Sequence, residues 1–130
     1  MVFDAVKEYI ANSGIVPKAV FKADTSVQYD AIFYLGKPEQ IEAEQYLVYS
    51  FKQNGGSVVK RYTLEILVCA KEAVVSEELK EKVVDLLNFY CRPVKIRRFT
   101  KFVLSEAEGI NYDPDTGVYF NRLVFDCYYL

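Results

Sequence analysis

The feature that most constrains this fold is a pair of long β-favouring runs joined by a turn. Residues 46–53 and 57–71 are rich in Val, Leu, Ile and Tyr, and residues 54–56, Asn-Gly-Gly, accept the positive φ values of a hairpin connection. Along the second run one face is apolar, while the other is polar at its start and apolar at Leu67 and Cys69. The pattern predicts a strand with one face in a core and both faces buried near its end. Its extended length of about 50 Å predicts a hairpin that projects beyond its own core.

Apolar periodicity predicts two helices. The short N-terminal helix has its apolar positions at i, i+3 and i+7, namely Phe3, Val6 and Ile10. Gly14 ends this helix by taking the left-handed conformation. The main helix is expected over 75–91, with Ser76 as its N-cap, acidic residues in its first turn and Pro93 beyond its end. Its apolar stripe consists of Leu79, Val83, Leu86, Leu87 and Tyr90.

Shorter runs complete the predicted sheet. Strands are expected over 15–21, 29–35, 94–105 and 118–129, with turns at 24–26 and 111–117 and a loop over 36–45. The fold class is therefore α+β: a mostly antiparallel sheet of about five to six strands, with the main helix packed on it. The length of 130 residues fits one domain, spanning 1–130.

Composition excludes several kinds of protein. A net charge of −2 with 52% hydrophobic residues is incompatible with disorder. Without histidine, a Ser-His-Asp or Cys-His nucleophile and a His-ligated zinc are impossible. Cys69, Cys91 and Cys127 form no C-x-x-C pair, which favours three buried free thiols in a reducing compartment. With neither a signal peptide nor a long apolar run, the chain is expected to be a soluble intracellular domain without membrane contact.

Two charged clusters could carry chemistry. The acidic one, Glu106, Glu108, Asp113 and Asp115, lacks the spacing of a calcium loop, and Asp-Pro-Asp-Thr-Gly is typical of a turn. We therefore expect a structural turn rather than a metal site.

The basic cluster comprises Arg92, Lys95, Arg97, Arg98 and Lys101. Strand alternation would place Arg98 and Phe102 on one face, and Phe99 and Lys101 on the other. Because this divides the charges between the faces, specific nucleic-acid binding is disfavoured. A solvated or interfacial strand is expected, with an acidic protein partner as the alternative.

Tyrosine-rich strands and the end of the chain point to interfaces. Eleven tyrosines are present, many of them on predicted strands, and tyrosine is common at core margins and interfaces alike. The apolar run 123–130 is either a central strand or an unprotected edge that pairs with another subunit. No constellation resembles an active site or a cofactor motif, so we expect a protein that is not an enzyme and carries no cofactor.

The layout resembles the tail-terminator proteins, also called tail-completion or minor capsid proteins, of long-tailed bacteriophages and prophages. The resemblance rests on the N-terminal helix followed by small strands, and on the hairpin whose second strand carries R-Y-T-L-E-I over 61–66 before the Glu/Lys-rich helix. It also rests on the ending over 112–126, where D-P-D-T-G-V-Y leads into a last strand.

This resemblance implies a structural subunit that assembles into a ring, commonly of six. Such a ring caps the finished tail tube and offers the surface on which the head docks, so the protein is expected in the virion after assembly in the bacterial cytoplasm. Its partners are copies of itself, the tail tube and head–tail connector proteins. The basic side chains are expected to meet an acidic surface of a neighbour or of the tube. The candidate interface residues are Arg61, Tyr62, Arg97, Arg98, Lys101, Tyr128 and Tyr129.

Two alternatives stay open. One is another neck or tail component, such as a head-closure or tube protein. The other is a small intracellular binding domain, or an enzyme working through carboxylates such as Glu65 and Asp126. A pocket with convergent acidic groups would favour that enzyme.

Overall fold

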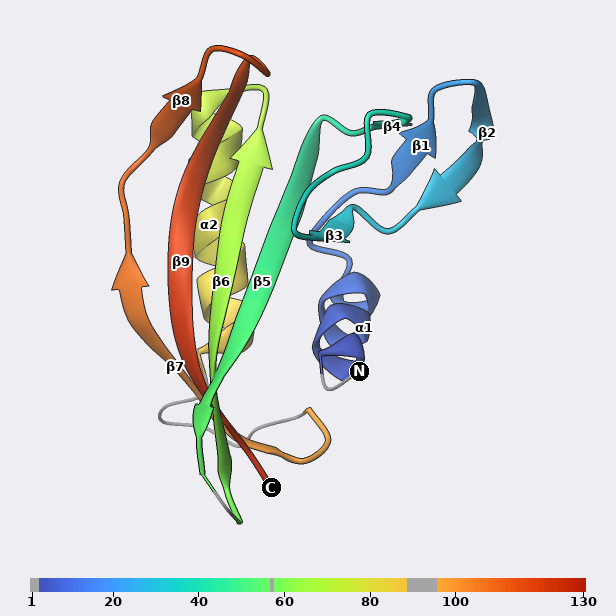
Figure 1. Ribbon diagram of the computed structural model, residues 1–130. Helices are drawn as coiled ribbons and strands as arrows, with labels where there is room; N and C mark the ends of the chain where they lie inside the picture. Colours follow the sequence, from blue (N-terminus) through green and yellow to red (C-terminus); the bar gives the residue numbers. More distant parts are fainter. Residues whose placement is uncertain (1–2, 57, 89–95) are drawn as a thin grey trace.

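The computed structural model describes residues 3–56, 58–88 and 96–130. These residues form two α-helices and nine β-strands (Figure 1). In chain order the elements are α1 (Asp4–Ser13), β1 (Ala19–Phe21), β2 (Asp24–Tyr29), β3 (Ile32–Tyr34), β4 (Ile41–Glu42), β5 (Gln45–Gly55), β6 (Lys60–Ala70), α2 (Ala73–Leu87), β7 (Phe99–Ala107), β8 (Asn111–Asp113) and β9 (Val118–Tyr129).

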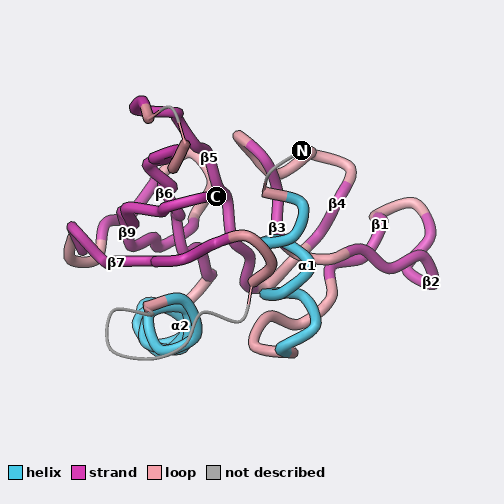
Figure 2. The backbone as a smooth tube through the Cα atoms, turned by 90° about the horizontal axis from the view of Figure 1, so that it is seen from below, coloured by secondary structure: helices cyan, strands magenta, loops and turns pink. Residues whose placement is uncertain are grey.

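The main sheet has the strand order β3-β5-β6-β9-β7. β8 also pairs with β9, at the start of β9 and ahead of the part that pairs with β7. All of its neighbours are antiparallel except β3, which runs parallel to β5. Both helices lie on one side of this sheet (Figure 2). The predicted α+β class with a mostly antiparallel sheet is confirmed.

A second, smaller sheet has the order β2-β1-β4 and extends to one side of the molecule in both views (Figures 1 and 2). Every residue of β2 is exposed. A strand without a buried face carries no alternation of apolar and polar residues. This is why residues 24–26, which belong to β2, were expected to form only a turn.

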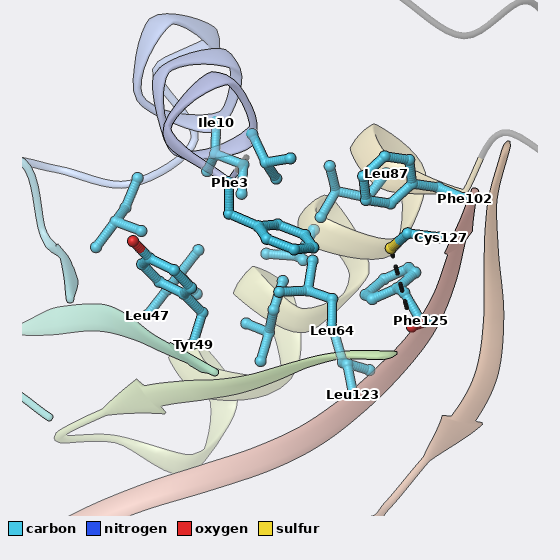
Figure 3. Packing of buried hydrophobic residues seen from close by; sticks show 14 of the residues in the cluster. Phe3, Ile10, Leu47, Tyr49, Leu64, Leu87, Phe102, Leu123, Phe125 and Cys127 are labelled. Atoms are coloured by element: carbon cyan, nitrogen blue, oxygen red, sulfur yellow. Dashed lines mark hydrogen bonds between the residues drawn. The ribbon is translucent and has the colours of Figure 1, made fainter. Parts of the chain in front are cut away.

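The hydrophobic core lies between the helices and the main sheet. Phe3, at the start of α1, is almost completely buried among rings from β5, β6 and β7. Figure 3 shows it beside Leu64 and the side chains of β9. From α2, Leu79, Val83 and Leu87 complete this core as predicted. Leu86 is only half-buried, and Tyr90 lies outside the described residues.

The main helix differs from the prediction at its start. It begins at Ala73, with Glu72 at the cap position, and its first turn has no acidic residue. Ser76 is therefore not the N-cap. It is fully buried, and its hydroxyl donates to the carbonyl oxygen of Val68 at 2.9 Å while accepting from Asn121 Nδ2 at 2.8 Å. Ser76 thus fixes the helix to the sheet. The helix ends at Leu87 and not at 91 as predicted, because Asn88 is extended, with a φ of −83° and a ψ of 95°. Pro93 lies outside the described residues.

The strand boundaries also differ from the predictions. The first strand is only β1, the strand expected over 29–35 is the three-residue β3, and the expected loop over 36–45 contains β4. β7 begins at Phe99, later than the predicted start at 94, and extends to Ala107; the expected turn over 111–117 begins with the short strand β8. These short strands are defined by backbone pairing with another strand, such as β4 with β1 and β8 with β9, and the pattern of a single segment does not contain that pairing.

The long hairpin is confirmed. β5 and β6 pair from Gln45↔Ala70 to Gly55↔Arg61, and Gly55 and Gly56 have positive φ. Its tip extends past the end of α2 (Figure 1). Because β9 pairs with β6 on one side and β7 on the other, the C-terminal strand is central rather than an edge.

Candidate functional site

The face of the main sheet opposite α2, here called the outer face, carries three of the seven predicted interface residues, namely Arg61, Lys101 and Tyr128. On β6 the even-numbered side chains from Tyr62 to Ala70 point into the core, so Arg61, Thr63 and Glu65 point to the outer face. The register places Arg61 opposite Tyr128, and Tyr128 opposite Lys101. Three segments distant in sequence therefore form one row across β6, β9 and β7.

In this row the Tyr128 ring lies between two cations. The Arg61 Cζ and the Lys101 Nζ are each 5.9 Å from its centroid. Both cations are exposed, whereas the tyrosine is half-buried. Cations over a ring face gain roughly 0.5–1 kcal/mol at exposed sites. The tyrosine therefore orients two positive charges outward without neutralising them.

Arg98 and Tyr129 form a second contact close by. The Arg98 Cζ lies 4.7 Å from the Tyr129 ring centroid, and its Nε donates to the Leu130 carbonyl oxygen at 2.7 Å. Arg98 has a φ of 69°, which turns the chain into β7. Arg98 thus holds the last residues of its own chain in place, and Arg97 beside it is exposed.

Tyr62 lies apart from this surface. Only 6% of it is exposed, and its ring packs against Phe3, Phe51 and Tyr129. Tyr62 is therefore a core residue in the folded chain.

A β-bulge interrupts the alternation of side chains that was predicted along β7. Between Phe99 and Lys101 the register shifts by one residue, with Thr100 as the extra one. Phe99 and Phe102 consequently both point into the core, and Lys101 points outward. The Thr100 hydroxyl donates to the Tyr128 carbonyl oxygen at 3.4 Å, which supports the bulge. The prediction that Phe99 and Lys101 share a face was wrong, because a bulge interrupts the period of two.

Positive charge gathers at the hairpin end of the molecule. The exposed cations in this basic end are Lys52, Lys60, Arg61, Arg97, Arg98 and Lys101. The nearest acid on the outer face is the half-buried Asp126, paired in register with Thr63 and Val103. The chain as a whole has a net charge of −2, so this end is a local concentration of charge.

The middle of the outer face holds a network of ion pairs around Arg122. Its Nε donates to Glu65 at 2.8 Å, and its Nη1 lies 3.1 Å from Glu108 and 3.4 Å from Glu106. The hydrogen bond to Glu65 is the main cause that raises the pKa of Arg122. Glu65 is thus held by Arg122 on an open sheet face, rather than converging with Asp126 in a pocket.

The acidic turn is organised by its own hydrogen bonds. Asp113 accepts from the Asp115 amide at 3.0 Å with its side chain and from the Gly117 amide at 2.8 Å with its carbonyl. The described residues contain no group of three or more side chains placed to hold a metal ion.

A groove of about 630 Å³ lies on the outer face beyond this network. Its floor is apolar and includes Val48, Leu67 and Phe120. Burial raises the pKa of both Tyr46 and Cys69 to about 12, so both are protonated at neutral pH. On the rim, Lys71 is paired with Glu42 at 2.6 Å. The groove therefore presents an apolar floor, two protonated groups and an ion pair on its rim.

Sequence reasoning missed the Arg122 network and an acidic stripe on α2. Arg122 meets Glu65 only through the pairing of β9 with β6, which no local pattern contains. The stripe consists of Glu78, Glu81 and Asp85, whose helical spacing is a signal present in the sequence.

The described part of the chain contains no helix long and apolar enough to cross a membrane. No family model matches the sequence, and no curated protein matches it. Among solved structures, a chain from the virion of a native gene transfer agent (GTA) particle is similar, with a TM-score of 0.55 at 14% sequence identity. The similarity covers 76% of this chain and 78% of that chain. The two chains therefore have the same fold over about three quarters of their lengths.

Proposed function

We propose that this chain is a structural subunit of a phage-like virion, and that it closes the tail tube as a ring on which the head docks. The observation that carries the proposal is the fold shared with a virion chain over more than three quarters of both chains. The layout of helices, hairpin and last strand that resembles tail-terminator proteins supports the finer assignment.

The surface chemistry suits a protein that binds other proteins. The outer face offers a basic end, an ion-paired centre and an apolar groove, all solvent-facing. Aromatic residues and arginine are enriched in protein interfaces, and a charged rim steers partners into register. The projecting hairpin extends this surface beyond the core, where a neighbouring subunit or the tube can contact it (Figure 1).

A tube-elongation experiment tests this function. The tube subunit of the virus or prophage that encodes this chain is polymerised, the purified protein is added, and tube lengths and tube ends are scored by electron microscopy. The proposal predicts that elongation stops and that a ring covers one end of each tube. Unchanged tube lengths with bare ends would contradict it. Incorporation along the tube wall would favour a tube component, and binding only to head connectors would favour a head-closure protein.

A further inference from the structure

We propose that the acidic surface recognised by the basic end is the exposed stripe of α2 on a second copy of this chain. The inference rests on the proposed function and adds the contact that would repeat around the ring. It commits to one occupant, a copy of the same chain.

The stripe is a compact set of free carboxylates. Glu78, Glu81 and Asp85 are all exposed, and their spacing of three and four residues places them along one side of α2. Exposed Lys82 lies on the same side, so this side carries three acids and one base. None of the three forms an ion pair within the described part of the chain, whereas Glu77 on the flank is paired with Lys80 at 2.8 Å.

Three acids of the outer face are already engaged in the same copy, and Asp126 on that face is half-buried. Glu65, Glu106 and Glu108 surround Arg122. An incoming cation would have to compete with a guanidinium that holds all three. A cation that binds the stripe on α2 displaces no ion pair. The stripe is therefore the better acidic partner.

The two surfaces lie on opposite sides of one molecule. α2 covers the inner face of the main sheet (Figure 2). Strand alternation and register place Arg61 and Lys101 on its outer face. A single copy cannot bring its own basic row onto its own α2. The contact must be between copies, and each copy keeps one surface of each kind available.

Apolar side chains accompany the charges on both surfaces. Val58, at the hairpin tip, is 76% exposed, and Val74, in the first turn of α2 and on the side of the stripe, is 67% exposed. Burying such residues against each other would add hydrophobic stabilisation to the charge pairing. The two surfaces are therefore matched in charge and in apolar content.

A contact between two different surfaces is heterologous, so it propagates from copy to copy. It forms a closed ring where the rotation between copies closes, and an open filament where it does not. Complementary charge at such a contact mainly sets register and partner choice. This arrangement gives the proposed ring a defined head-to-tail direction.

Charge exchange tests the contact. One variant carries Arg61→Glu and Lys101→Glu, and another carries Glu78→Lys and Glu81→Lys. Each alone places like charges at every contact, so we expect association at least tenfold weaker than in the wild type. An equimolar mixture, and a variant with all four substitutions, restore opposite charges and are expected to regain association. In the mixture the two variants must alternate.

Matched controls carry the same charge changes elsewhere. Lys18→Glu and Glu8→Lys each reverse an exposed charge away from both surfaces and from the groove, and are expected to associate normally. Circular dichroism and thermal unfolding verify that every variant folds.

Zero-length carbodiimide crosslinking between isotope-labelled and unlabelled copies provides a readout for weak association. We expect crosslinks between copies from Lys101 to Glu78 or Glu81. Their absence, normal association of either double variant, or failure of folded variants to recover on mixing overturns the inference. If the variants associate normally and still cap tubes, only this contact fails. If the crosslinks form and tubes stay uncapped, the proposed function fails instead.

Discussion

Ser76 and Asn121 form a polar contact inside an apolar core. Both are fully buried, and the Asn121 amide donates to the Ser76 hydroxyl, which in turn donates to the Val68 carbonyl. Asn121 Oδ1 is buried without a hydrogen-bond partner in the described structure. This pair joins α2, β6 and β9, so it specifies where the helix sits on the sheet.

Ser76→Ala is therefore expected to lower the free energy of unfolding by about 1–3 kcal/mol, because the buried Asn121 amide loses its acceptor. Urea unfolding measures the change, with Ser50→Ala on the outer face as a control that changes it by less than about 0.5 kcal/mol. Combining Ser76→Ala with Asn121→Leu removes both polar groups and should recover part of the loss. A Ser76→Ala protein as stable as the wild type would contradict the role given to this pair.

Buried thiols and a phenol make the fold sensitive to alkaline pH. Burial raises the pKa of Cys69 and Tyr46 to about 12, and burial also raises the pKa of Cys127. The unfolded chain releases these protons from about pH 9 upward, while the folded chain retains them. The stabilisation is thus complete below about pH 9 and is lost as pH rises toward 12.

We accordingly expect the free energy of unfolding to fall between about pH 9 and 11, as measured by urea unfolding at several pH values. Tyr46→Phe and Cys69→Ala remove titrating groups and should flatten this dependence, whatever they do to the absolute stability. A dependence as steep in both variants as in the wild type would count against these assignments.

At the scale of elements, the hairpin turn depends on a backbone conformation that side chains disfavour. Gly56 has a φ of 100°, and a Cβ at this position would lie against the Val59 carbonyl. Gly56→Ala must therefore rearrange the tip, at a cost of about 1–3 kcal/mol.

Gly36→Ala is the matched control for this substitution. Gly36 has ordinary φ and open space around its Cβ position, so its replacement is expected to be nearly neutral. Urea unfolding compares the two variants. Equal stability of both would show that the turn tolerates a side chain and that Gly56 has no special role.

Elements with a buried face were predictable from the sequence, and those defined by pairing alone were not. The hairpin, β9 and the buried stripe of α2 follow from alternation and helical spacing, because burial imposes those periods. β2 and β8 are mostly exposed, so no period marks them. Ser76 shows the limit at a single residue: a polar residue near a helix start resembles a cap, and only the packing against Asn121 reveals its actual partner.

The candidate surface was likewise predictable only in part, because strand pairing decides which of its residues lie together. Arg61, Lys101 and Tyr128 were singled out by residue type, but the row they form depends on the register of three strands. The bulge at Thr100 then decides which side chains of β7 face outward. Bulges depend on the partner strand, so a period of two read along β7 alone assigned Phe99 to the wrong face.

At the scale of the whole molecule, two features favour assembly over a solitary role. Positive charge is concentrated at the hairpin end although the chain is slightly acidic overall, and free carboxylates lie on α2 across the sheet. Such a separation gives one molecule two complementary surfaces that it cannot satisfy alone. Head-to-tail association would satisfy both surfaces, and the ring proposed above is a closed form of such association.

Absolute mass in solution tests the ring most directly. Light scattering over a hundredfold range of protein concentration, with electron micrographs of the large species, distinguishes a closed ring from other states. Six copies of the 15.0 kDa chain give a mass of about 90 kDa. We predict one discrete species near that mass with a central hole. A mass that stays at 15.0 kDa throughout, with or without tail tubes present, or one that grows without limit, would contradict the account.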